Sequence, residues 1–297
     1  SGSKTALLDV HFADATTGIA VGHNGIIIRT TDAGETWTLQ PSGTTQMMHG
    51  VFFNDAATGI AAGANGTILR TTDGGVSWLQ QPSGVTTVLS GIAFTDANTG
   101  TVVGSVGTIL RTTDAGFTWT PIASGTTSGL YRIAFANATN GTIVGDGGTM
   151  LRTTDGGATW AAQASGITSH LADVSFVDAN NGTIAGYTGT ILRTTNGGAT
   201  WTAQTSGTTS LLFGVAFSDA NTGTVVGSGG TILRTSNGGA TWMPQTSGTT
   251  EGFRSVSLAG SSTVIAVGGN GTILRATDVG RTWIKQDAGP LYTINGV

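Results

Sequence analysis

The sequence predicts an all-β fold, a seven-bladed β-propeller with four antiparallel strands in each blade. Two observations lead to this prediction: a fixed repeat of 41 residues runs through the chain, and each repeat contains short apolar runs separated by Gly, Asn, Asp and Ser turns. Self-similarity at a period of about 40–45 residues, with four short strands per unit, is typical of propellers. The tryptophans mark the period, at Trp37, Trp78, Trp119, Trp160, Trp201, Trp242 and Trp283.

One repeat, residues 215–255, shows the expected elements in order. Strand A ends at 215–217, strand B spans 224–226, strand C spans 231–235, strand D begins at Thr241–Trp242, and a connection at 246–250 leads to the next repeat. Asp, Asn and Gly supply the backbone conformations that the intervening turns require. Because repeats of this kind bury their faces only against their neighbours, we expect a single domain over residues 1–297.

Strand A, the innermost strand, has one copy too many for seven blades. Val10 has an equivalent in every later repeat, and the last equivalent is Val297. The N-terminal copy is complete, whereas the C-terminal copy stops before its Phe position. We therefore expect residues 5–12 to belong to the first blade and residues 289–297 to form a tail or an extra edge.

Composition excludes several classes of function. Charged residues make up 9% of the chain and the formal net charge is −4, so the sequence offers no basic field for nucleic acid. Cysteine is absent, which excludes disulfides and thiolate metal sites. No apolar run approaches the ~20 residues of a spanning helix, so we expect no membrane insertion. We expect a monomer, with no cofactor and no metal.

A recurring motif occupies the turn between strands C and D. Its first copy reads Thr30-Thr31-Asp32-Ala33-Gly34-Glu35-Thr36-Trp37, which resembles the Asp-box of sialidase-like and related propellers. Two copies carry Asn at the acidic position, and an amide can accept hydrogen bonds but cannot act as a base. We therefore predict a structural role, in which this oxygen closes the hairpin while the Trp packs between blades. The seven positions are Asp32, Asp73, Asp114, Asp155, Asn196, Asn237 and Asp278.

The longer frame Gly-Thr-Ile-Leu-Arg-Thr-Thr-Asp-Gly-Gly-x-Thr-Trp looks like the photosystem II stability/assembly factor family of seven-bladed propellers. The resemblance implies a non-enzymatic scaffold that binds a protein, such as a subunit of a membrane complex, and that presents arginines to it. For the periodic arginines from Arg29 to Arg275 we expect instead a repeated brace to a carboxylate or a carbonyl. An exported location, periplasmic, lumenal or secreted, is expected, with the leader absent from this sequence.

The repeats differ from one another mainly in the D–A connections and the B–C turns. Because strands alternate in direction, these segments should share one face of the ring, opposite the face that carries the A–B turns and Asp-boxes. Loops on a rigid scaffold are where binding residues usually lie. The candidate binding residues on this face are His23, His49, Tyr131, Arg132, Asp146, His170, Asp173, Tyr187, Phe213 and Arg254.

Three alternatives to a protein-binding scaffold stay open at this point. A carbohydrate-binding propeller would use Tyr131, Tyr187 and Phe213 to stack on sugar rings. A designed or recently amplified repeat would have no evolved ligand, since the seven units contain no insertion or deletion. A glycosidase needs two carboxylates beside the scissile bond, and Glu occurs only as Glu35 and Glu251, so we predict no catalytic residue and no enzyme activity.

Overall fold

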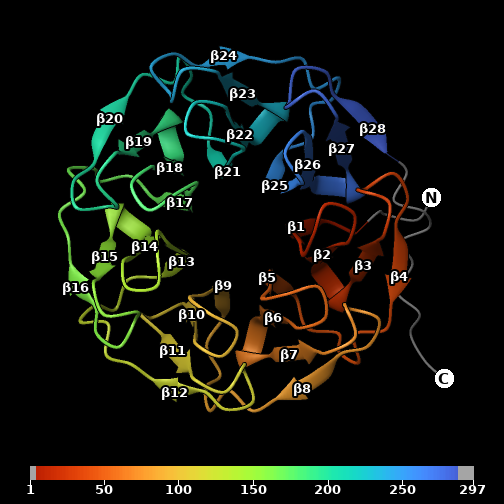
Figure 1. Cartoon of the computed structure of the whole chain (residues 1–297), viewed down its shortest axis with the longest axis vertical. Coiled ribbons are helices and arrows are strands. Elements are labelled where there is room, and N and C mark those ends of the chain that lie inside the picture. Colours follow the sequence, from red (N-terminus) through yellow and green to blue (C-terminus); the bar gives the residue numbers. More distant parts are fainter. Residues whose placement is uncertain (1–4, 287–297) are drawn as a thin grey trace.

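The computed structural model describes residues 5–286, which form seven four-stranded antiparallel sheets around a common axis (Figure 1). Within each sheet the strands follow chain order from the axis outward. The predicted seven-bladed propeller is confirmed.

The A strands lie next to the axis and the B and C strands pair outward from them. The A strands are β1 (Leu7–Phe12), β5 (Met48–Phe53), β9 (Leu89–Phe94), β13 (Leu130–Phe135), β17 (Leu171–Phe176), β21 (Leu212–Phe217) and β25 (Phe253–Ala259). The B strands are β2 (Gly18–Gly22), β6 (Gly59–Gly63), β10 (Gly100–Gly104), β14 (Gly141–Gly145), β18 (Gly182–Gly186), β22 (Gly223–Gly227) and β26 (Thr263–Gly268). The C strands are β3 (Ile27–Thr30), β7 (Ile68–Thr71), β11 (Ile109–Thr112), β15 (Met150–Thr153), β19 (Ile191–Thr194), β23 (Ile232–Thr235) and β27 (Ile273–Ala276).

The D strands are short and form the outer edge of each blade (Figure 1). They are β4 (Thr38–Gln40), β8 (Leu79–Gln81), β12 (Thr120–Pro121), β16 (Ala161–Ala162), β20 (Thr202–Gln204), β24 (Met243–Pro244) and β28 (Ile284–Gln286). The prediction that strand D begins at Thr241–Trp242 is wrong by two residues. Thr241 and Trp242 belong to the Asp-box turn, where the Thr241 N–H donates to Asn237 Oδ1 at 3.0 Å.

The apolar core lies between neighbouring blades. Trp78 shares a buried cluster with Phe53 of its own blade and with Ile19 and Ile27 of the preceding blade. The Trp78 ring meets the Phe53 ring edge to face, with centroids 6.1 Å apart. Four of the other six clusters include one tryptophan, and Trp283 and Trp201 pack against the remaining two. This arrangement confirms that the tryptophans pack between blades.

The Asp-box closes its hairpin through side-chain oxygens. Asp155 Oδ1 accepts from the Thr153 hydroxyl at 2.7 Å and from the Thr159 N–H at 2.9 Å. Asn196 Oδ1 accepts the equivalent bonds from Thr194 and Thr200 at 2.9 and 3.0 Å. The amide therefore replaces the carboxylate in this role, as the sequence predicted.

Periodic arginines connect consecutive blades through carbonyl groups. Arg29 Nε donates to Gly74 O at 2.8 Å, and the same bond recurs from Arg70, Arg234 and Arg275. The bond from Arg275 to Ala33 O, at 2.9 Å, joins the last blade to the first. Of the two predicted forms of the brace, these four arginines show the carbonyl form.

The ring is closed by the N-terminal copy of strand A. β1 is part of the first sheet, as predicted for residues 5–12. The predicted tail at residues 289–297 lies outside the described residues. Within residues 5–286 no helix has the length and apolar character needed to cross a membrane.

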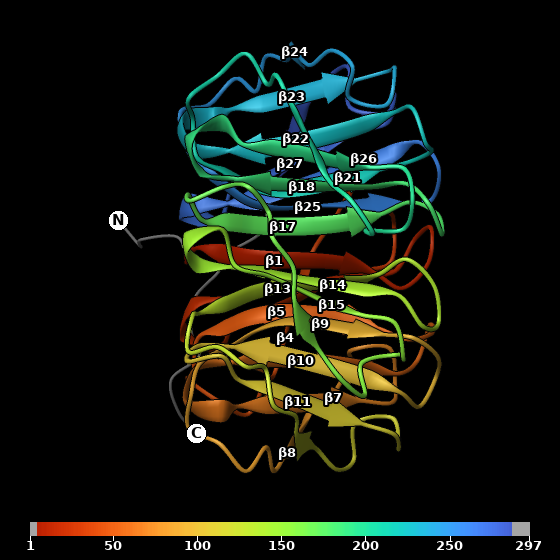
Figure 2. The same cartoon turned by 90° about the vertical axis from the view of Figure 1, so that its left-hand side faces the viewer.

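The strands run along the axis of the ring, so the loops gather on its two faces (Figure 2). On one face the Ala64 N–H of a B–C turn donates to Met47 O of a D–A connection at 2.8 Å. On the other face the Gly74 N–H of an Asp-box donates to Ala57 O of an A–B turn at 2.8 Å. We call these the D–A face and the Asp-box face.

Candidate functional site

A β-bulge interrupts every A strand near the D–A face. In β1 the register shifts between Leu7 and Asp9, and the other six A strands shift at the equivalent residue. A bulge leaves one residue unpaired and changes where its side chain points. The seven bulged residues line one cavity of about 580 Å³, which we call the mouth. They are Leu8, His49, Ser90, Tyr131, Ala172, Phe213 and Arg254.

Aromatic side chains follow one another around part of the mouth. The His170 and Tyr187 rings lie 4.9 Å apart, and the Tyr187 and Phe213 rings lie 5.7 Å apart at 86°. The Arg254 guanidinium carbon lies 4.5 Å from the centre of the Phe213 ring. The Tyr187–Phe213 and Phe213–Arg254 contacts each cross a blade boundary. Edge-to-face aromatic pairs contribute stability beyond the area they bury.

Asp146 joins this series to Tyr131. His170 Nδ1 lies 2.7 Å from Asp146 Oδ1, and the Tyr131 hydroxyl donates to the same oxygen. Burial, followed by the bond to Asp146, raises the pKa of the Tyr131 hydroxyl, which therefore stays protonated as a donor. We call the connected set Tyr131, Asp146, His170, Tyr187, Phe213 and Arg254 the aromatic arc.

Three charged side chains form the floor of the mouth. Arg132 lies 3.2 Å from Asp9 and 3.8 Å from Asp173, measured between the nearest nitrogen and oxygen atoms. Its guanidinium also donates to Ser90 O at 2.9 Å and to His49 O at 3.4 Å. We call Asp9, Arg132 and Asp173 the charged floor.

Both carboxylates of the charged floor also accept a backbone N–H from the next blade. Asp9 Oδ2 accepts from Val51 at 3.0 Å, and Asp173 Oδ2 accepts from Val215 at 2.8 Å. Burial nevertheless raises the pKa of the Asp173 carboxyl to about 7, against the opposing influence of Arg132. The site therefore contains an aspartate that changes charge near neutral pH.

Other repeats have glycine at the position that Asp9, Arg132 and Asp173 occupy, and two of these glycines leave space for the charged floor. A Cβ atom at Gly50 would lie 2.3 Å from Ser90 O, and one at Gly91 would lie 2.8 Å from the Cα atom of Arg132. A second cavity of about 430 Å³ lies along the A strands on the other side of the floor, and Arg132 lines both cavities.

His11 lines the second cavity rather than the mouth. Its ring centroid lies 4.6 Å from that of Phe52, and its Nδ1 accepts the Phe53 N–H at 3.3 Å. Burial lowers the pKa of His11 to about 4, so the ring is neutral and packs as a core side chain.

The structure brings the predicted binding residues together around one axis. His23, His49, Tyr131, Arg132, Tyr187, Phe213 and Arg254 line the mouth. Asp146 and His170 contact Tyr131 from the loops above it, and Asp173 lies in the floor. The predicted set leaves out the floor residue Asp9. It also leaves out the mouth residues Ala6, Leu8, Met47, Ser90, Ala172, Glu251, Gly252 and Gly269. A comparison of equivalent positions in the repeats could have indicated Asp9, because Asp9, Arg132 and Asp173 occupy the same position of their repeats.

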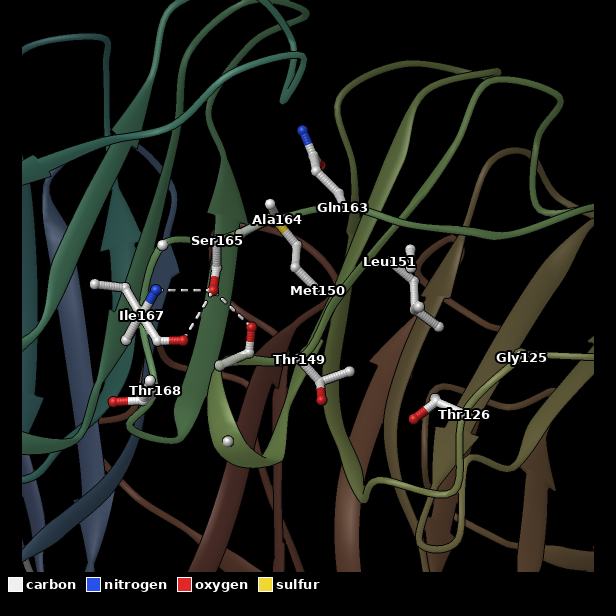
Figure 3. A pocket seen from close by; sticks show the side chains of 14 residues that line it. Gly125, Thr126, Thr149, Met150, Leu151, Gln163, Ala164, Ser165, Ile167 and Thr168 are labelled. Carbon is white, nitrogen blue, oxygen red and sulfur yellow. Dashed lines mark hydrogen bonds between the residues drawn. The ribbon is translucent and has the colours of Figure 1, made fainter.

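Other grooves on the surface recur at equivalent positions of several repeats. Figure 3 shows one beside Ser165, whose hydroxyl donates to Gly148 O at 2.7 Å and accepts the Ile167 N–H at 3.2 Å. Equivalent grooves occur one and two repeats away, at residues 204–209 and 80–87. Because these grooves recur with the repeat, we attribute them to the architecture of the blades and not to a site for a particular ligand.

The sequence profile described as "Photosynthesis system II assembly factor YCF48" matches residues 2–79, 40–123, 118–202 and 202–291. The chain belongs to this YCF48 family. No protein with a curated record matches the sequence.

Solved structures show the same architecture. A structure titled "YCF48 bound to D1 peptide" superposes with a TM-score of 0.76 at 21% identity, over 93% of this chain and 92% of the other. YCF48 from Cyanidioschyzon merolae gives a TM-score of 0.76 at 20% identity, over 93% and 97%. The Niastella koreensis GH74 enzyme gives 0.75 at 16% identity, over 96% of this chain and 54% of that one. At these identities the likeness concerns the fold.

Proposed function

We propose that this YCF48-family chain is a non-enzymatic scaffold that holds a peptide segment of a membrane-complex subunit at the mouth on the D–A face. The observation that carries the proposal is the aromatic arc. Its members occupy positions at which the seven repeats carry different residues, yet they contact one another from blade to blade. Tyr and Arg are the side chains that most often anchor protein interfaces.

The bound relative supports the kind of partner. A structure titled "YCF48 bound to D1 peptide" has a YCF48 propeller holding a peptide, and we extend peptide binding to this chain on the strength of family membership. The mouth, at about 580 Å³, falls within the usual range of binding cavities, about 300–1,000 Å³.

The carboxylates around the mouth fit binding better than hydrolysis. A glycosidase uses one carboxylic acid and one free carboxylate across the scissile bond. Here Asp9 and Asp173 share Arg132 and accept backbone N–H groups, and Asp146 accepts the Tyr131 hydroxyl and lies 2.7 Å from His170 Nδ1. Sugar stacking is also disfavoured at Phe213, because Arg254 covers its ring.

Calorimetric titration with a synthetic D1 peptide tests the proposal. Tyr187→Ala and His170→Ala copy residues that equivalent positions already carry, Ala64 and Ala6, so the fold should tolerate them. We expect each to weaken peptide binding by about tenfold or more, as for interface anchors. Val76→Ala on the Asp-box face, where Ala158 is the equivalent residue, is the matched control and should bind as the wild type does.

Two outcomes would contradict the proposal. Peptide binding that survives both arc substitutions would place the site elsewhere on the ring. Binding of soluble oligosaccharides by the protein alone, with no binding of the peptide, would establish the carbohydrate-binding alternative.

A further inference from the structure

We propose that the mouth selects a partner segment in which a carboxylate lies next to an aromatic side chain, and that Arg254 receives the carboxylate. The inference rests on the proposed function and specifies the chemistry of the peptide.

The geometry of Arg254 suits a carboxylate receptor. Its side chain is exposed, and its guanidinium lies over the Phe213 ring, 4.5 Å from the ring centre. This cation–π contact holds the guanidinium beside the ring, and among residues 5–286 the Arg254 side chain donates no hydrogen bond, so its N–H groups are available to a ligand. A planar guanidinium matches the two oxygens of a carboxylate in a bidentate pair.

Arg254 has no acidic partner among residues 5–286. The ion pairs of the described chain involve Asp9, Asp146 and Asp173, and none includes Arg254. The nearby Glu251 accepts the Asn270 side-chain N–H at 2.8 Å. Glu251 also lines the mouth and is bonded to a neutral amide, so Arg254 is the group at the rim that an incoming carboxylate would contact.

The charged floor determines how a segment can enter. Arg132 bonds to carbonyls of two blades, pairs with both floor aspartates and lines both cavities, so the charged floor lies between the mouth and the second cavity. A side chain on a turn or at a chain end can reach the mouth from the D–A face without passing this floor. Apolar lining at Leu8, Met47 and Ala172 surrounds that space.

The arc favours an aromatic group as the inserted side chain. Tyr187 and Phe213 already meet edge to face at 86°, and a further ring would extend this arrangement. Such contacts contribute about 0.5–1.5 kcal/mol beyond burial. The carboxylate on Arg254 would then lie beside this ring, because Arg254 stacks on Phe213.

Short capped peptides test this chemistry by NMR titration. The probes are acetyl-Gly-Phe-Asp-Gly-amide, its Asn and its Ala-for-Phe counterparts, and acetyl-Gly-Gly-Phe as the free acid and as the amide. We expect the carboxylate forms to bind about five- to tenfold more tightly than their amide counterparts, and loss of the ring to weaken binding similarly. The stronger of the two acids shows whether the carboxylate belongs to a side chain or to a chain end.

Arg254→Gln identifies the receptor. This variant should bind the acid and amide forms equally, whereas Arg281→Gln, on the Asp-box face, should retain the wild-type preference. Equal binding of acid and amide by the wild type, a preference that survives Arg254→Gln, or no shift of mouth resonances at millimolar probe would each overturn the inference.

The two proposals fail in different ways. If the D1 peptide binds through Tyr187 and His170 while Arg254→Gln changes nothing, the proposed function stands and the carboxylate selection is wrong. If the capped acids bind selectively and the D1 peptide does not, the selection stands and the membrane-complex partner is wrong.

Discussion

Asp155 and Asp173 have opposite pKa shifts because their surroundings differ. The hydroxyls of Thr159 and Thr153 bond to Asp155 and hold the pKa of its carboxyl at about 2. Asp173 accepts two backbone N–H groups and lies near Arg132, yet burial raises its pKa to about 7. The hydrogen bonds of the Asp-box therefore favour the charged form of Asp155, whereas burial in the floor favours the neutral form of Asp173.

The Asp173 shift predicts an unusual pH dependence of stability. Its folded pKa exceeds its unfolded value of about 3.8, so its contribution is fully present below about pH 4 and is lost as the pH rises through about 7. Asp173→Asn removes this titration, while Asp9, Arg132 and His49 remain in place around it. We expect the variant to gain stability relative to the wild type between pH 4 and 8, measured by urea unfolding. Parallel stability curves would show that the residue does not titrate in this range.

Trp160 and Asp155 separate packing from charge within one Asp-box. Trp160 is 8% exposed, so Trp160→Ala should cost about 3–5 kcal/mol of unfolding free energy. Asp155→Asn should cost less than about 1 kcal/mol, because Asn196 makes the same bonds in the next blade. Thermal unfolding of the two variants checks both values. A larger loss from Asp155→Asn than from Trp160→Ala would contradict this account of the box.

At the scale of elements, the B–C turn shows how the repeat tolerates strain. The middle residue of this turn adopts a left-handed conformation, which Asn and Gly accept readily. Asn24, Asn65, Gly147, Gly229 and Asn270 occupy it in five blades. The other two blades have Val106 and Thr188, with φ of 56° and 57°, and β-branched residues seldom adopt this conformation.

Val106→Asn should therefore stabilise the ring. Val106 is 65% exposed, so little apolar burial is lost when it is replaced. Relief of the left-handed strain is expected to raise the unfolding free energy by about 1 kcal/mol. Differential scanning calorimetry checks this, with Val106→Ala as the control because Ala retains most of the strain. No gain from Asn over Ala would mean that this turn stores no strain.

The sequence was sufficient for the blades and partly sufficient for the mouth, where differences between repeats indicated residues such as Tyr187 and Phe213. Seven tryptophans and a fixed period determine the strand order, and the Asn at two Asp-boxes reveals their structural role. The bulge has no residue signature, since Leu8, Ser90 and Tyr131 share a register but no chemistry. The regular alternation of side chains along a strand therefore could not show which position of the repeat points into the mouth. The pairing of Asp9 with Arg132 depends on blades that face each other across the axis.

At the scale of the whole molecule, repetition and variation occupy different parts of the ring. Asp-boxes, tryptophans and the arginine braces build a rigid frame, and the last brace closes it between Arg275 and Ala33. The aromatic arc occupies blades four to seven, on the D–A face alone. A rigid frame that carries variable side chains at one end suits preorganised binding, because little ordering is needed when the partner arrives.

The most direct test of this account compares the two faces in one binding measurement. The Kd for the D1 peptide is measured for the wild type, for Tyr187→Ala/Phe213→Ala in the arc, and for Arg111→Ala/Arg152→Ala in the periodic arginine band. Arg111 and Arg152 are not among the four arginines that brace consecutive blades through Nε, and Arg152 bonds to Asn140 of its own blade at 3.0 Å, so the second pair leaves those four braces in place. We predict at least about a tenfold increase in Kd for the arc pair and a change within about twofold for the band pair. Loss of binding from the band pair, with the arc pair unaffected, would contradict a binding site at the mouth.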